Sequence, residues 1–275
     1  MSAIVDAGSF RDPRGRVYIE GDRVFRTVTS SGIADYAHVR DTGLYEKLIS
    51  EKRLVGIEER DVEYAQAGPG VEALLEHPRI PMISYPYEWG FQLLKKAAIF
   101  QLEVYLEALR YDVTLTDATA YNVQFVGTSP IFIDHLAFRK YVEGEYWLGH
   151  RQFCEQFINP LLLRSALGIP HNAWYRGALE GISTNELSAL LPFGKKLSWN
   201  VLLHVVLQAH FQQASLSSGD RSMISTDRRL PKKSFERMLM GLRDWIAKLE
   251  PKGSGRSVWS DYEDDNSYSF GAAKQ

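Results

Sequence analysis

The hydrophobic pattern of the chain changes near residue 90, and this change most constrains its fold. Before it, short runs rich in β-branched and aromatic residues alternate with turns. After it, apolar residues recur at the spacing of an amphipathic helix. This pattern predicts an α+β fold with a small β-rich N-terminal part and a larger, mainly helical C-terminal part. A length of 275 residues, 45% of them hydrophobic, suits one bilobed domain or two small ones.

The N-terminal part is predicted to begin with a β-hairpin. Residues 16–20 and 23–28 are β-prone runs joined by Gly-Asp at 21–22, a good turn sequence. Three further elements are expected: a helix over about 33–51, one or two strands within 53–64, and a short apolar strand at 79–84. Because Pro86 cannot donate to a strand ladder, residues 85–89 should leave the sheet as an extended connector.

The C-terminal part is predicted to open with a long amphipathic helix over 91–109. The later elements expected are two short β pieces at 121–125 and 130–133, and helices that include 199–212 and 233–249. Beyond Pro251 the composition shifts to Gly, Ser, Asp and Lys, which is typical of a linker.

Three polar residues in this part form a set that suits phosphoryl transfer. Asp117 is followed by Asn122 and then by Asp134, which ends the second short β piece. Transfer from a nucleoside triphosphate needs one carboxylate to deprotonate the acceptor hydroxyl. It also needs an amide oxygen and a second carboxylate to hold Mg²⁺. An Asn at the start of one strand and an Asp at the end of the next lie at one end of a hairpin, so these two residues are expected to share a metal.

This Asp-x4-Asn set, followed by an apolar strand that ends in Asp, resembles the catalytic loop and metal-binding segment of the protein-kinase-like superfamily, most closely its aminoglycoside and choline kinase branch. The resemblance implies a kinase-like domain over 1–250, with an N-lobe over about 1–84, a hinge at 85–89 and a C-lobe over 90–250. It implies ATP and Mg²⁺ as cofactors, Asp117 as the catalytic base, and Asn122 and Asp134 as metal ligands.

The same resemblance implies a nucleotide site around the hinge. Tyr85 to Tyr87 would meet adenine through the backbone, and their rings would line the pocket. The glycine-rich loop of the family is absent, and no strand lysine is present to grip the phosphates. Arg26 is the best-placed cation instead, with Glu46 as its expected partner and Glu51 nearly as good.

A second, narrower resemblance concerns segments 83–89, 117–125, 132–134 and 146–154. They are similar to the N-terminal region of bacterial proteins that carry a class I S-adenosylmethionine-dependent methyltransferase domain at their C-terminal end. Residues 251–275 are then expected to be a linker leading toward such a domain. The resemblances together imply phosphoryl transfer to the hydroxyl of a small-molecule substrate. The alternative is a catalytically silent module that presents substrate to an attached or partner methyltransferase.

Composition argues against two other classes of partner. The net charge is −2 and no basic stripe accompanies the aromatic residues, so no nucleic-acid binding is expected. No run of eighteen apolar residues and no secretory signal are visible, so the expected location is cytoplasmic and away from membranes.

Cys154 is the single cysteine of the chain, which excludes an intramolecular disulfide and a cage of several thiolates around zinc. A buried, inert thiol is the expectation for this residue. His204 and His210 share a predicted helix, but at a spacing that does not put them on one face as metal ligands would be.

Overall fold

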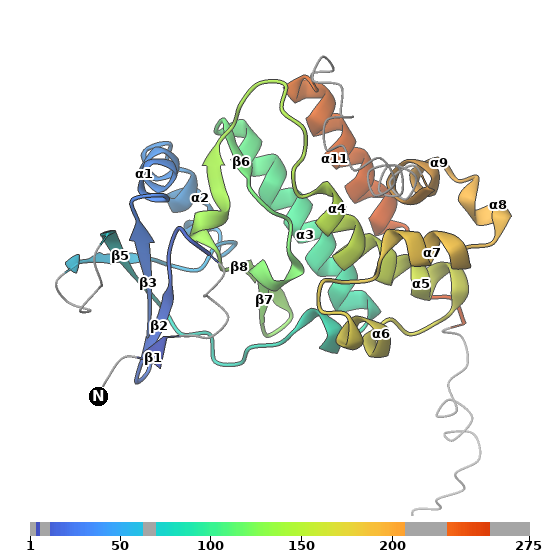
Figure 1. The fold of residues 1–275 in the computed structure, drawn as a ribbon, viewed down its shortest axis with the longest axis horizontal. Coiled ribbons are helices and arrows are strands. Elements are labelled where there is room, and N and C mark those ends of the chain that lie inside the picture. The colour runs from blue at the N-terminus through green and yellow to red at the C-terminus, as the bar shows by residue number, and fades with distance from the viewer. Residues whose placement is uncertain (1–3, 6–11, 63–69, 207–229, 254–275) are drawn as a thin grey trace, which may run out of the picture.

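The computed structural model describes residues 4–5, 12–62, 70–206 and 230–253. Its N-terminal part is a five-stranded antiparallel sheet in the order β1-β2-β3-β5-β4, seen on the left of Figure 1. The strands are β1 (Ile4–Val5), β2 (Val17–Glu20), β3 (Arg23–Thr29), β4 (Glu58–Arg60) and β5 (Val71–His77).

The predicted hairpin is confirmed, and it fixes the register of the sheet. Strands β2 and β3 pair from Val17 with Arg26 to Glu20 with Arg23. The turn between them requires a positive φ at Gly21, which glycine adopts without strain. The strand predicted at 79–84 is wrong. Strand β5 just upstream pairs with β3 instead, because Pro78 and Pro81 interrupt the ladder downstream of it.

The helix predicted over 33–51 is broken in two. Helix α1 (Ile33–Asp41) ends just before Gly43, whose φ of 80° is left-handed, and α2 (Leu44–Ser50) starts directly after it. The break turns α2 so that Tyr45 packs edge-on against Phe138 and donates a hydrogen bond to the His135 carbonyl at 2.8 Å. Helix α2 therefore packs on the segment that follows Asp134.

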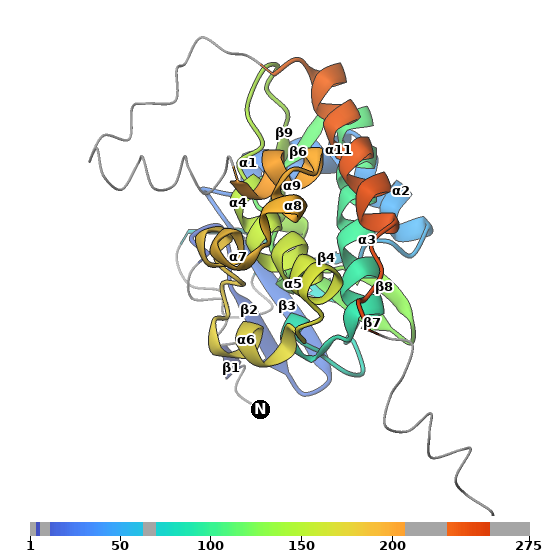
Figure 2. The same ribbon diagram turned by 90° about the vertical axis from the view of Figure 1, so that its right-hand side faces the viewer.

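The C-terminal part is built on the predicted long helix, α3 (Phe91–Arg110). The helix predicted over 233–249 is confirmed as α11 (Lys232–Ala247). It lies along α3 in both views (Figures 1 and 2). Tyr105 and Phe235 join the two helices edge to face, with ring centroids 5.3 Å apart.

Short strands and helices complete this part. The strands are β6 (Val113–Leu115), β7 (Val123–Val126), β8 (Ser129–Phe132) and β9 (Phe138–Lys140). The helices are α4 (His150–Phe153), α5 (Asn159–Leu167), α6 (Asn172–Gly177), α7 (Thr184–Leu190), α8 (Phe193–Lys196) and α9 (Trp199–Val201), with π-helical segments at Cys154–Ile158 and Leu202–Val206. The helix predicted over 199–212 is thus partly π-helical, and its end lies outside the described residues.

The predicted α+β class is confirmed: a small β-rich N-lobe precedes a larger, mainly helical C-lobe. The elements follow in the order that the kinase-like resemblance implies, from hairpin through connector and long helix to a second hairpin. Of the predicted linker, only residues up to 253 are described. Within the described ranges, no helix is both long enough and apolar enough to cross a membrane.

Candidate active site

The β7–β8 hairpin brings Asn122 and Asp134 to the same end, as predicted. Asn122 ends a short 3₁₀ helix, Ala120–Asn122, and β7 starts at the next residue. Its carbonyl accepts a hydrogen bond from the N–H of Ile133 at 2.9 Å. Asp134 directly follows Ile133, so the backbone pairing of the hairpin sets the spacing of the two predicted metal ligands.

Asp117 joins this pair through a direct contact. The side-chain Nδ2 of Asn122 donates to Oδ1 of Asp117 at 3.0 Å. Burial raises the pKa of Asp117 to about 7, and the charge of Asp134 adds to the increase while Arg14 opposes it. The structure therefore brings together the three residues of the predicted set, and it gives Asp117 a pKa suited to proton transfer near neutral pH.

The segment after Gly149 holds the loop that carries Asp117. The side chain of Gln152 accepts a hydrogen bond from the N–H of Ala118 at 2.9 Å. One turn later, Gln156 accepts from the N–H of Ala120 at 2.8 Å and from the Thr119 hydroxyl at 2.9 Å. The Ala120 contact is buried and the other two are partly buried. Together they fix the loop, because a buried donor left unpaired would cost about 1–3 kcal/mol.

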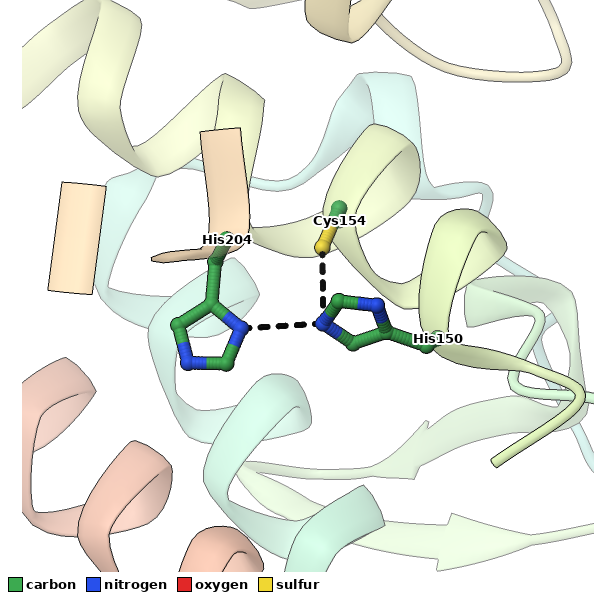
Figure 3. A group of neighbouring side chains, drawn as sticks. All are labelled: His150, Cys154 and His204. Atoms are coloured by element: carbon green, nitrogen blue, oxygen red, sulfur yellow. Dashed lines mark hydrogen bonds between the residues drawn. The ribbon is translucent and has the colours of Figure 1, made fainter. Parts of the chain in front are cut away.

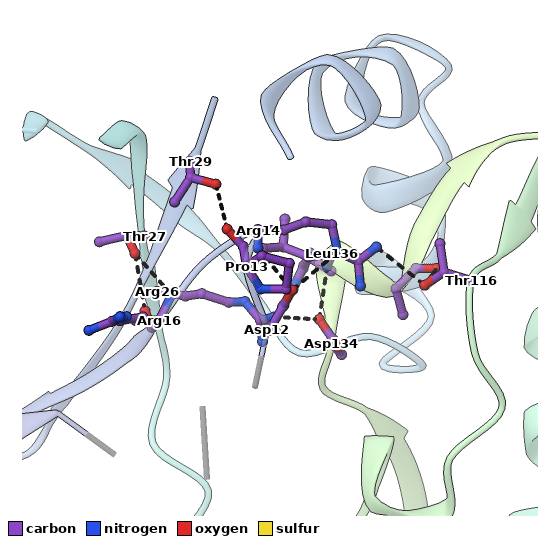
Figure 4. A network of polar contacts seen from close by, with 12 residues as sticks. Asp12, Pro13, Arg14, Arg16, Arg26, Thr27, Thr29, Thr116, Asp134 and Leu136 are labelled. Atoms are coloured by element: carbon purple, nitrogen blue, oxygen red, sulfur yellow. Dashed lines mark hydrogen bonds and ion pairs between the residues drawn. The ribbon is translucent and has the colours of Figure 1, made fainter. Parts of the chain in front are cut away.

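Arg26 lies in the site, but the partner predicted for it is wrong. Its Nη2 is 3.2 Å from Oδ1 of Asp134 and 2.6 Å from Oδ2 of Asp12 (Figure 4). Glu46 is exposed on α2, and Glu51 pairs with Lys47 and Arg53. The break at Gly43 gives α2 a different direction from the single helix that the sequence pattern suggested, so the predicted pairing with Glu46 does not form.

Asp12 and Arg14 were missed as site residues. The Nε of Arg14 lies 3.2 Å from Oδ1 of Asp12, and its Nη1 donates to the Thr116 hydroxyl at 3.3 Å (Figure 4). The N-terminal segment thus brings the positive charge of Arg14 to Thr116, the residue just before Asp117. Only the short motif Asp-Pro-Arg-Gly signalled this segment. Gly15 allows it to lie against β3, since a Cβ there would come within 2.0 Å of the Thr27 carbonyl.

The predicted hinge places Tyr85 and Tyr87 together. Their rings stack at 5.4 Å between centroids with an angle of 10° between planes, and Tyr85 is 43% exposed. The connector predicted to be extended is instead a 3₁₀ helix over Pro86–Glu88, and its backbone contact to adenine stays a prediction. The Tyr85 N–H donates to Glu88, its carbonyl accepts from the Glu88 N–H, and the Tyr87 carbonyl accepts from Asn172. That these rings line a nucleotide pocket also stays a prediction.

Gln124 anchors the start of the hinge in a way that sequence patterns did not reveal. Its amide pairs with both backbone groups of Ser84: Oε1 accepts from the N–H and Nε2 donates to the carbonyl, each at 3.0 Å. The side chain is buried on β7, so these two bonds tie the connector to the hairpin that carries the metal ligands.

Replacing Gln124 with alanine should lower the free energy of unfolding by about 1–3 kcal/mol, because two partly buried backbone groups of Ser84 lose their partner. Urea unfolding followed by circular dichroism measures the effect. Val126→Ala is the matched control, since Val126 lies on the same strand but is 52% exposed, and its change should stay within about 0.5 kcal/mol. Equal small effects of the two substitutions would contradict the anchoring role.

A cavity of about 250 Å³ lies elsewhere, between α5, α9 and α11. Its described lining residues include Leu162, Val201 and Trp245 and none of the candidate site residues. The cavity therefore gives no support to the phosphoryl-transfer set, which rests on its own contacts.

Comparison with known proteins gives one substantial sequence match. The chain is 42% identical over 268 residues to the nodulation protein NoeA of Rhizobium meliloti (strain 1021). The match covers 95% of the chain and 55% of that protein, so the chain spans about half the length of this relative. No known protein-family model matches the chain. Among solved structures, the PK-1 kinase of the Cydia pomonella granulovirus is similar with a TM-score of 0.38 and 11% identity, over 54% of this chain and 57% of that one.

Proposed function

We propose that the chain is a kinase-like domain that transfers a phosphoryl group from ATP, with Mg²⁺, to the hydroxyl of a small molecule. The observation that carries this proposal is the partly buried Asp117, which accepts a hydrogen bond from Asn122 and has a pKa of about 7. A carboxylate with such a pKa is ionised in about half of the molecules at neutral pH, and it is a stronger base toward an acceptor hydroxyl than an ordinary Asp.

The proposed metal-binding roles of Asn122 and Asp134 follow from which of their side-chain atoms are free to bind an ion. The amide nitrogen of Asn122 is used by Asp117, so its amide oxygen is the atom that would face a metal. The Asp134 carboxylate would supply the second ligand, since carboxylate and amide oxygens suit Mg²⁺. Arg26 now neutralises Asp134. Asn122 and Asp134 would hold the ion, and Arg26, which also pairs with Asp12, would supply a positive charge for the phosphates.

Replacing Asp134 with asparagine should remove the magnesium dependence of ATP binding. For the unchanged chain, ATP at about 100 times its dissociation constant should raise the stability by roughly 2.7 kcal/mol when Mg²⁺ is present. Thermal unfolding with ATP and Mg²⁺, and with ATP and a chelator, measures the difference. Asp41→Asn is the control, because that side chain is 69% exposed on α1. Equal Mg²⁺-dependent shifts in the Asp134→Asn and control variants would count against the metal assignment.

A second candidate function is a silent binding module, and a specific observation favours it. Arg26 already lies between two carboxylates, Asp12 and Asp134, and the Tyr85 backbone is already hydrogen-bonded. Such a module would bind its substrate without ATP turnover and present it to an attached or partner methyltransferase, a link that rests on the sequence resemblance. Phosphate release from γ-labelled ATP, measured with candidate hydroxyl acceptors, separates the two functions. Robust turnover excludes the silent module.

A further inference from the structure

A second group of chemically reactive side chains lies apart from the phosphoryl-transfer set. His150 is the first residue of α4, Cys154 opens the π-helical segment that follows it, and His204 lies in the other π-helical segment. Figure 3 shows the three side chains converging from these helical segments. π-Helical turns are rare and occur frequently at functional sites, and here two of them contribute to one cluster.

The distances within the group are close to those of ligands around one metal ion. Nε2 of His150 is 2.9 Å from Nδ1 of His204 and 3.6 Å from Sγ of Cys154. A tetrahedral zinc ion with bonds of about 2.0–2.1 Å to nitrogen and 2.3 Å to sulfur holds two nitrogens roughly 3.3 Å apart and nitrogen and sulfur roughly 3.6 Å apart. All three donor atoms lie within 4.8 Å of one another. Small side-chain movements would therefore suffice for one ion to bind all three.

The donor atoms of the group and their burial indicate which kind of ion would bind. Cys154 and His204 are almost completely buried, and His150 is partly exposed. Two imidazoles and one thiolate suit Zn²⁺ and similar borderline-soft ions, whereas Mg²⁺ and Ca²⁺ prefer oxygen.

We propose that His150, Cys154 and His204 bind a single transition-metal ion, with Zn²⁺ as the expected species and water in the fourth position. Spacing along one helix did not reveal this group, because it relates His204 only to His210. The partner of His204 comes from another helix, 54 residues away. A lone cysteine excludes a cage of several thiolates but not a site with one thiolate and two imidazoles.

The site would support the fold around the active-site loop. His150 and Cys154 belong to the proposed site. Gln152 and Gln156, on the same helical stretch, accept hydrogen bonds from the backbone N–H groups of Ala118 and Ala120. A metal ion would join this stretch to the Leu202–Val206 segment. It would thereby hold in place the residues that hydrogen-bond to the Asp117 loop. Its contribution would be to stability, separate from the magnesium ions of the proposed phosphoryl transfer.

The full chain, stripped of metal with a chelator and titrated with Co²⁺ alone, tests the proposal. We expect one equivalent to bind, with the visible absorption of a tetrahedral site and a near-ultraviolet charge-transfer band from the thiolate. Cys154→Ser should abolish the charge-transfer band and weaken Zn²⁺ binding at least tenfold in competition with a chromophoric chelator. His38→Gln is the control for loss of a histidine, because His38 lies on α1 in the N-lobe, and it should bind as the unchanged chain does.

A protein that binds no Co²⁺, or binds it without the sulfur band, would overturn the proposal and leave a hydrogen-bonded His–His–Cys group in its place. Folding of each variant is checked by circular dichroism in chelator. If Cys154→Ser does not fold, His150→Gln takes its place, since His150 is the most exposed of the three residues. Its visible spectrum must then change and its Zn²⁺ affinity fall. An affinity equal to that of the His38→Gln control would contradict the site.

Discussion

Replacing Asp117 with asparagine should lower the rate of phosphoryl transfer from ATP by about 10²–10⁴-fold, the range expected for loss of a general base. The substitution preserves size and leaves an oxygen that can accept from Asn122, so binding of ATP with Mg²⁺ should change little. Phosphate release from labelled ATP gives the rate, and thermal shift gives the binding. Asp41→Asn again serves as the exposed control.

The pKa of Asp117 adds a pH signature to the same variant. Its rise from 3.8 to about 7 means that the rate should increase with pH, reach half its maximum near pH 7 and level off above that, because only the ionised carboxylate accepts a proton. Between about pH 4 and 7 the folded chain binds a proton here that the unfolded chain does not. Its stability therefore falls as pH rises through this window. Asp117→Asn should remove that fall and be the more stable protein at pH 8.

Two outcomes would contradict the role of Asp117. Turnover by Asp117→Asn at the rate of the unchanged chain would exclude it as the base. A stability difference between the two proteins that stays constant from pH 4 to pH 8 would exclude the raised pKa.

Replacing Gly149 with alanine should disturb both the fold and the site. A Cβ at this position would lie 2.7 Å from Cβ of Ala118, 2.8 Å from its backbone nitrogen and 2.9 Å from the carbonyl carbon of Asp117. Backbone atoms cannot turn aside as the end of a flexible side chain can, so the loop must shift. We expect a loss of about 1–3 kcal/mol in the free energy of unfolding. Turnover should fall as well, because small displacements of catalytic groups are costly.

Gly241→Ala is the matched control for this substitution. Gly241 lies within α11, and a Cβ there meets no atom within 4 Å. Alanine should stabilise the helix at this position by about 0.5–1 kcal/mol. Urea unfolding and ATP turnover are measured for both variants. A Gly149→Ala protein with the stability and turnover of the unchanged chain would show that α4 does not pack closely on the loop.

Local sequence patterns correctly predicted those helices and strands that are specified by neighbouring residues alone. The Gly-Asp turn specified the hairpin of β2 and β3, and the apolar spacing of 91–109 specified α3. The same reasoning failed where neighbouring signals competed. Apolar periodicity ran through Gly43, whose left-handed conformation ends one helix, and an apolar run at 79–84 suggested a strand that its proline prevents.

The sequence by itself determined the two-part α+β fold and the set of Asp117, Asn122 and Asp134. The reason is that hydrophobic periodicity, turn residues and the order of polar residues can all be read from neighbouring positions in the chain. Only the tertiary structure decided the partners of these groups. Arg26 pairs with Asp12 and Asp134 rather than Glu46, Gln124 binds Ser84 from 40 residues away, and His150 meets His204 across 54 residues. Contacts of this range depend on how helices and strands pack, and packing leaves no periodic signal in a single sequence.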